Sequence, residues 1–107
     1  MTPQPLEIFA ATLPLGHAQD RRPWLVVEQT DPVRWRMLPI SAATDLFDPA
    51  LHFRLDPRHP DFPATGLRKA SFIIANWPVD AAEAVLQKRI GRLEGRLADE
   101  FTRWLGR

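Results

Sequence analysis

Residues 20–28 read Asp-Arg-Arg-Pro-Trp-Leu-Val-Val-Glu, and residues 36–41 read Arg-Met-Leu-Pro-Ile-Ser. The first stretch is typical of a polar loop that enters a buried strand. Pro23 lacks a backbone N–H and suits the first residue of a strand, and large and β-branched side chains follow it. The second stretch predicts another strand, which ends at the hydroxyl of Ser41. If the two strands pair, Arg22 and Ser41 meet at one rim of a sheet, where a guanidinium beside a hydroxyl suits phosphate recognition.

The composition predicts one compact domain over residues 1–107, with residues 1–5 as a flexible tail. Hydrophobic residues make up 45% of the chain, so a packed core is expected. The net charge of +1 gives no global signal for nucleic acid, so any basic site must be local. The chain has no cysteine, which excludes disulfides, zinc thiolate sites and cysteine nucleophiles.

No apolar run approaches the roughly 18 residues that span a bilayer. The first residues also lack the basic start and apolar run of a secretory signal. A cytoplasmic protein with no membrane contact is therefore expected. The three histidines, His17, His52 and His59, form no metal pair at helical spacing, so we expect neither a metal nor another cofactor.

Alternating or continuous apolar runs bounded by proline, glycine and polar residues predict short strands. These runs are residues 6–13, 24–29, 33–40, 51–55 and 70–75.

The last third of the chain predicts helices. Asp80 and Glu83 have the spacing of a capping box, which indicates a helix that continues to Ile90 and stops at Gly91. Residues 93–105 carry apolar side chains along one helical face. Many short strands closed by one or two helices favour a mainly β fold, a small barrel-like antiparallel sheet.

Two residues are the first candidates for chemistry. Arg22 is interpreted as a phosphate ligand or transition-state stabiliser at the entrance of a strand, and the alternative is a solvated loop arginine. Ser41 is interpreted as a second phosphate ligand, and the alternative is an ordinary strand end or helix cap.

Further substrate contacts are expected from the loop before Arg22 and from a basic rim. His17 is a possible acid or base near phosphate, and Asp20 is a candidate base. Arginines on neighbouring strands could follow a single strand of nucleic acid, or they could be scattered charges balanced by acids. The further substrate-binding candidates are His17, Gln19, Asp20, Arg21 and Arg36, with Arg34, Arg68 and Lys69 on the rim. Lys88 and Arg89 are expected on a solvated helix face.

The order of these pieces resembles the MazF/PemK-like toxins of toxin–antitoxin systems. Two motifs carry the resemblance: Arg-Pro and an apolar strand at residues 22–27, and Ile-Gly-Arg-Leu at residues 90–93. Leu-Pro-Ile-Ser at residues 38–41 and Thr-Gly-Leu at residues 65–67 match further pieces. The resemblance extends over residues 6–105.

This resemblance implies an SH3-like small barrel of about five to seven strands with one or two C-terminal helices. It also implies a homodimer and a metal-independent endoribonuclease that cuts single-stranded RNA and is silenced by an antitoxin. In that chemistry the 2′-hydroxyl attacks the adjacent phosphate and leaves a cyclic phosphate and a 5′-hydroxyl. Arg22 matches the arginine of the family, and Ser41 matches a position where threonine is usual.

Two alternatives remain open. The loop at residues 16–21 is shorter than in the family, which favours a non-catalytic binding protein of the same fold, such as a CcdB-like gyrase inhibitor or a degenerate toxin homologue. The other alternative is a plain SH3-like interaction module. Fold alone does not choose among these functions.

Overall fold

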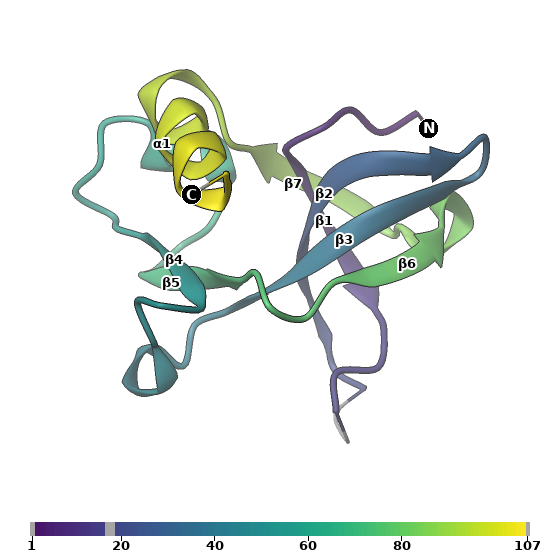
Figure 1. The fold of residues 1–107 in the computed structure, drawn as a ribbon, viewed down its shortest axis with the longest axis horizontal. Coiled ribbons are helices and arrows are strands. Elements are labelled where there is room, and N and C mark those ends of the chain that lie inside the picture. Colours follow the sequence, from purple (N-terminus) through teal and green to yellow (C-terminus); the bar gives the residue numbers. More distant parts are fainter. Residues whose placement is uncertain (1, 17–18, 107) are drawn as a thin grey trace.

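Two long neighbouring strands, β2 (Arg21–Asp31) and β3 (Arg34–Ser41), form the centre of the molecule (Figure 1). They come from a computed structural model that describes residues 2–16 and 19–106. A two-residue turn joins them, as the Asp-Pro sequence before β3 predicts. Arg21 and Arg22, expected in a loop, already belong to β2, because both pair with β1.

Seven antiparallel strands in the described ranges form one sheet, in the order β4-β5-β3-β2-β1-β7, and β6 also pairs with β3. The other strands are β1 (Glu7–Thr12), β4 (His52–Leu55), β5 (Ser71–Ile74), β6 (Val79–Ala82) and β7 (Lys88–Arg92). Three 3-10 turns interrupt the loops: η1 (Thr44–Leu46), η2 (Phe62–Thr65) and η3 (Glu83–Val85). One α-helix, α1 (Gly95–Leu105), closes the chain. The predicted mainly β fold is confirmed.

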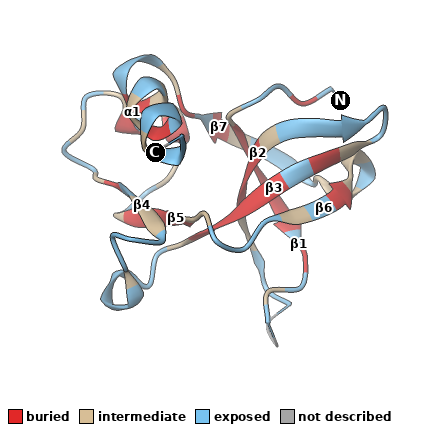
Figure 2. Cartoon of the chain, viewed as in Figure 1, coloured by how far each residue is buried: buried red, intermediate tan, exposed pale blue. Residues whose placement is uncertain are grey.

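The middle of strand β2, Trp24 to Val26, is buried on both faces, which explains its continuous apolar run. Leu25 packs into a first core cluster that reaches α1, whereas Trp24 and Val26 pack into a second cluster with Trp35 and Met37. Figure 2 shows the buried residues concentrated along the strands and on the inner side of α1. Side chains therefore alternate between two cores rather than between a core and solvent.

Two prolines lie inside the central strands without breaking the sheet. Pro23 pairs with Ala10 of β1, and the pairing of β2 with β3 begins only at the next residue, Trp24. Pro39 pairs with Trp24, but on its other side it falls between the register of β6, which ends at Met37, and that of β5. Each proline thus has a neighbouring strand on only one side, where a missing N–H is tolerated.

The helix predicted from Asp80 to Ile90 is wrong. Residues 79–92 form β6, η3 and β7 instead. The Asp80 carboxylate accepts a hydrogen bond from Thr30 and forms an ion pair with Arg34, so it does not cap a helix. Long-range pairing with β3 and β1 outweighs the local helix preference, which amounts to only tenths of a kcal/mol per residue.

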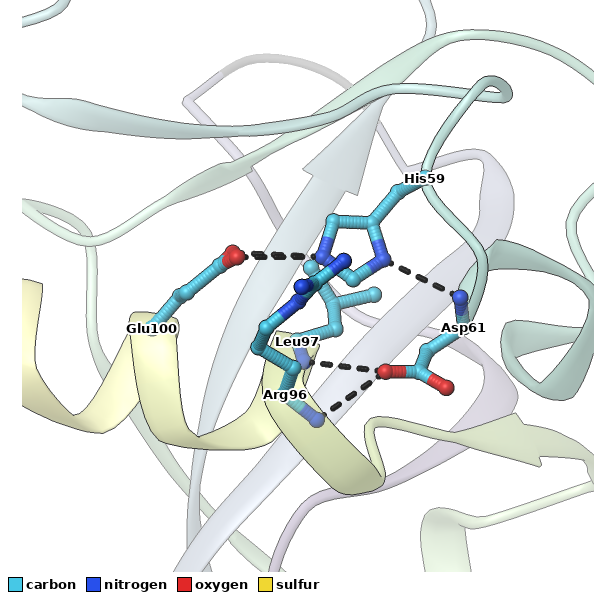
Figure 3. A network of polar contacts seen from close by, with 5 residues as sticks. All are labelled: His59, Asp61, Arg96, Leu97 and Glu100. Carbon is cyan, nitrogen blue, oxygen red and sulfur yellow. Dashed lines mark hydrogen bonds and ion pairs between the residues drawn. The ribbon is translucent and has the colours of Figure 1, made fainter.

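The amphipathic helix predicted at residues 93–105 is confirmed as α1, and Leu97 and Phe101 are buried in the first cluster. Its start is capped from a distant loop (Figure 3): Asp61 accepts hydrogen bonds from the backbone N–H groups of Arg96 and Leu97, at 3.0 and 3.3 Å. A carboxylate there also complements the positive end of the helix dipole. The fold thus uses a loop side chain to start the helix.

His59 ties the same loop to the middle of α1 (Figure 3). Its Nδ1 accepts a hydrogen bond from the Asp61 backbone N–H at 3.0 Å, which assigns the proton to Nε2. That Nε2 lies 3.1 Å from the Glu100 carboxylate, to which it donates. The histidine therefore acts as a structural link between the loop and α1.

Two glycines allow this loop to approach β7 closely. A Cβ on Gly91 would lie 2.4 Å from the carbonyl oxygens of Ala64 and Thr65, and a Cβ on Gly66 would lie 2.1 Å from that of Ile90. Gly66 also has a φ of +72°, which favours glycine. Gly91, predicted to stop a helix, therefore lies within a strand and allows this close contact.

None of the described helices is long and apolar enough to cross a membrane.

Candidate active site

Arg22 and Ser41 lie at the same end of the paired strands β2 and β3. The pairing of β2 with β3 begins at Trp24 and Pro39, so each of the two residues lies two positions beyond it. Arg22 pairs with Ala11 of β1, and Ser41 pairs with Phe72 of β5. Both positions follow the two-residue alternation of Trp24 and Met37, which assigns them to the face of the second cluster. The structure puts both residues at this end of the strand pair, and the meeting of their side chains stays a prediction.

Arg22 is mostly buried yet keeps hydrogen-bond donors unused. Its side chain is only 19% exposed, and its Nε is buried without a partner among the described residues. One Nη lies 3.9 Å from a carboxylate oxygen of Asp20, whose side chain is 80% exposed. A buried unsatisfied donor costs roughly 1–3 kcal/mol. Such a guanidinium is suited to an anion that supplies the missing acceptors.

Ser41 presents a hydroxyl whose oxygen is held by the following turn. Its Oγ accepts a hydrogen bond from the Ala43 backbone N–H at 3.1 Å. That bond uses an oxygen lone pair and leaves the hydroxyl hydrogen available as a donor. Arg22 and Ser41 together therefore offer a charged and a neutral donor at the same end of β2 and β3, as binding of two phosphate oxygens requires.

The other predicted contacts are divided among several places. Asp20 joins Arg22 through the ion pair described above, and Gln19 is exposed in the loop before it. Arg21 donates through Nε to the side chain of Gln87 at 2.8 Å. His17 lies outside the described residues.

Arg36 does not join this group. It lies five residues before Ser41 on β3, about 16 Å along the strand, and alternates onto the opposite face. There it forms an ion pair with Glu28 of β2. Its donors are therefore partly used within the sheet.

A basic hollow, not foreseen as a unit, lies near the start of β2. It has a volume of about 310 Å³, and its cations are Arg21, Arg68, Lys88 and Arg89. The rim predicted from Arg21 and Arg68 is thus partly assembled, but Lys88 and Arg89 were expected on a helix. Within the described part of the chain only Arg89 of these four has an acidic partner, Glu7. The missed signal is the strand β7 (Lys88–Arg92), which carries the Lys-Arg pair to this hollow.

No group of three potential metal-ligating side chains occurs in residues 2–16 and 19–106. The site therefore consists of hydrogen-bond donors and one nearby carboxylate. Such a set can bind a phosphodiester and stabilise negative charge on it.

Comparison with known proteins gives matches by structure. No protein-family model and no curated protein sequence matches the chain. The Mycobacterium tuberculosis toxin MazF-mt6 superposes with a TM-score of 0.69 at 17% identity, covering 94% of this chain and 92% of the toxin. An endoribonuclease in complex with its cognate antitoxin, from a mycobacterial species, superposes with a TM-score of 0.70 at 13% identity, covering 98% and 92%. The protein therefore has the fold of the MazF-like toxins.

Proposed function

We propose that the protein is the toxin of a toxin–antitoxin system and cleaves single-stranded RNA in the cytoplasm without a metal ion. The observation that carries the proposal is Arg22, a mostly buried arginine whose Nε has no partner among the described residues and which lies at the same end of the β2–β3 pair as Ser41. The likeness to two solved structures, one titled a MazF toxin and the other an endoribonuclease, supports the same class.

In the proposed reaction the RNA 2′-oxygen attacks the adjacent phosphorus and the bond to the 5′-oxygen breaks. The 2′-hydroxyl proton passes to a base, for which Asp20 is the candidate, and the leaving 5′-oxygen takes up a proton. Arg22 stabilises the negative charge that grows on the phosphoryl oxygens and can donate that proton. Ser41 donates to a phosphoryl oxygen. The products are a 2′,3′-cyclic phosphate and a 5′-hydroxyl.

The test is incubation of the purified protein with a long unstructured RNA in EDTA. Discrete fragments that end in cyclic phosphate are expected from the wild-type protein and not from an Arg22→Ala variant. Arg36→Ala is the matched control, since it removes an arginine from the same strand pair and should leave cleavage intact. RNA that stays whole would instead favour the non-catalytic binding protein, and inhibition of gyrase would then be measured.

An antitoxin is the second proposed partner. One of the similar structures is titled a complex with a cognate antitoxin, and a peptide that occupies the Arg22–Ser41 end would block RNA. Competition between the antitoxin peptide and a single-stranded oligonucleotide, measured by fluorescence anisotropy, tests this arrangement. Simultaneous binding of both ligands would contradict it.

A homodimer is also proposed, built on an apolar surface around Leu105. Leu51, Trp77 and Leu105 are 42%, 45% and 43% exposed, and Leu105 and Ala75 line two adjoining hollows. Burial of such a surface against a second copy is favourable. Sedimentation of wild-type protein should show a dimer that Trp77→Glu dissociates and Val33→Glu, at the distant β2–β3 turn, does not. A 12.2 kDa species at every concentration would refute the dimer.

A further inference from the structure

A second hollow, of about 360 Å³, lies next to Ser41. Phe72, which lines it, is the β5 residue that pairs with Ser41, and Thr44 follows Ser41 by three residues. We call it the Arg54 hollow; its lining includes Thr44, Phe47, Arg54, Asp56, Arg58 and Phe72. The hollow therefore adjoins the position assigned to the scissile phosphate.

The wall of the Arg54 hollow is aromatic and fixed. The Phe47 ring meets the Phe72 ring edge-on at a centroid distance of 5.7 Å, and His52 stacks on Phe72 at 4.7 Å. The Arg54 guanidinium lies over the Phe47 ring, 4.7 Å from its centroid. Aromatic rings and guanidinium planes are the surfaces on which unpaired RNA bases stack. Phe72 is itself buried, so the surfaces offered to a flat heteroaromatic group are the exposed Arg54 guanidinium and the half-buried Phe47 ring beneath it.

The polar groups of the hollow leave one set of donors unused. Arg58 holds Asp56 through its Nε and Nη2, at 3.2 and 2.9 Å. The side-chain hydrogen bond from Arg58 is the main cause that lowers the pKa of Asp56 to about 2, so this carboxylate stays ionised and paired. Arg54, in contrast, donates no hydrogen bond to any residue in the described ranges. The Arg54 fork is thus the free recognition group of the hollow.

We infer that the Arg54 hollow binds the nucleobase next to the scissile phosphate and prefers guanine. A planar arginine fork matches two neighbouring acceptors, and guanine presents O6 and N7 in that arrangement. Adenine replaces one of these acceptors with an amino donor, so it forfeits one of the two hydrogen bonds. The inference rests on the proposed ribonuclease function, since that function assigns the phosphate to Arg22 and Ser41.

The experiment measures binding without cleavage. Full-length protein with Arg22→Ala is titrated with two fluorescent single-stranded oligonucleotides that differ only in guanine against adenine at one position. A preference of about tenfold for guanine is expected, in the range of a good bidentate contact. Adding Arg54→Ala should reduce the preference to about one, and Arg54→Lys should keep affinity for both oligonucleotides but lose most of the preference. Arg103→Ala, an exposed arginine on α1, is the matched control and should retain the preference.

Two results would overturn the inference: no guanine preference in the starting protein, or a preference that survives Arg54→Ala. If Arg54→Ala weakened the binding of both oligonucleotides equally, Arg54 would act only as a positive charge, and the inference would also be overturned. Thermal unfolding of each variant shows whether it remains folded. If wild-type protein fails to cut RNA while the Arg54-dependent preference is present, the proposed ribonuclease function is refuted and the guanine preference is not. Cleavage without that preference refutes only the guanine site.

Discussion

Arg22 and Arg36 lie toward opposite ends of the β2–β3 pair, and their surroundings differ. Arg36 is half-exposed and paired with Glu28, which is also half-exposed. Arg22 is 19% exposed, and among the described residues its buried Nε has no partner and its acidic neighbour, Asp20, lies at 3.9 Å. The comparison teaches that residue type does not identify the site. What distinguishes Arg22 is that packing holds its guanidinium while its donors remain unused.

The largest expected effect comes from replacing each arginine by lysine. Arg22→Lys keeps the positive charge but loses the planar fork, so cleavage of RNA should fall about 100-fold, the scale of losing one preorganised donor. Arg36→Lys retains its ion pair with Glu28 and should change cleavage less than threefold. Single-turnover cleavage rates of both variants decide the matter. Equal losses at the two ends would show that the contrast between them has no functional meaning.

Ser41, on the neighbouring strand β3, provides a second test of the site at the Arg22 end. Ser41→Ala removes the hydroxyl donor at the Arg22 end of the strand pair and should lower the cleavage rate about tenfold, as loss of a hydrogen bond to a charged group does. Ser41→Thr keeps the hydroxyl and should stay within threefold of wild type. The two rates are compared under identical salt. Full activity of Ser41→Ala would restrict the site to Arg22.

A stability measurement tests whether Arg22 lowers the free energy of unfolding. Arg22→Met retains apolar bulk and removes the buried unpartnered Nε, so the free energy of unfolding should rise by about 1 kcal/mol while cleavage is lost. Arg36→Met, at the exposed end, should change it by less than about 0.5 kcal/mol. Urea denaturation of both variants gives the two values. A clear loss of stability in Arg22→Met would mean that the guanidinium is satisfied in the folded protein.

The smallest effect is expected from making the Arg36 end more like the Arg22 end. Glu28→Gln removes the partner charge of Arg36. Because that ion pair is half-exposed, the free energy of unfolding should change by less than about 0.5 kcal/mol. RNA affinity should rise less than twofold, since Arg36 lies far from Ser41 along β3. Anisotropy titrations at two salt concentrations check this. A large gain in affinity would indicate that RNA also runs over the Arg36 face.

Local patterns were sufficient for the central strands and the last helix. The apolar run of β2, the alternation in β3 and the helical spacing of Leu97 and Phe101 each correspond to a face that is buried in the structure. These patterns were predictive because a strand or helix with a buried face needs apolar residues at a fixed spacing, and that spacing can be read directly from the sequence. The pairing of β2 with β3 then followed from their adjacency, and it puts Arg22 and Ser41 at the same end of the two strands.

The segment at residues 79–92 shows where local patterns fail. Its residues have no strong preference of their own, and what decides their conformation is the unpaired edges of β3 and β1. The same long-range assembly carries Lys88 and Arg89 to the basic hollow and brings Phe47, Arg54 and Phe72 together beside Ser41. Neither hollow is visible in the sequence, because its residues come from separate elements.

The sequence by itself determined the mainly β class, the position of the last helix and the choice of Arg22 and Ser41 as candidates. Only the tertiary structure decided that residues 79–92 form two strands and a 3-10 turn and that Arg36 is paired with Glu28. It also decided that Arg22 and Arg54 have donors without a partner among the described residues. The physical reason is that periodicity and turn chemistry act between near neighbours in the chain. Burial of a donor and the supply of its partners depend on residues brought together from the whole chain.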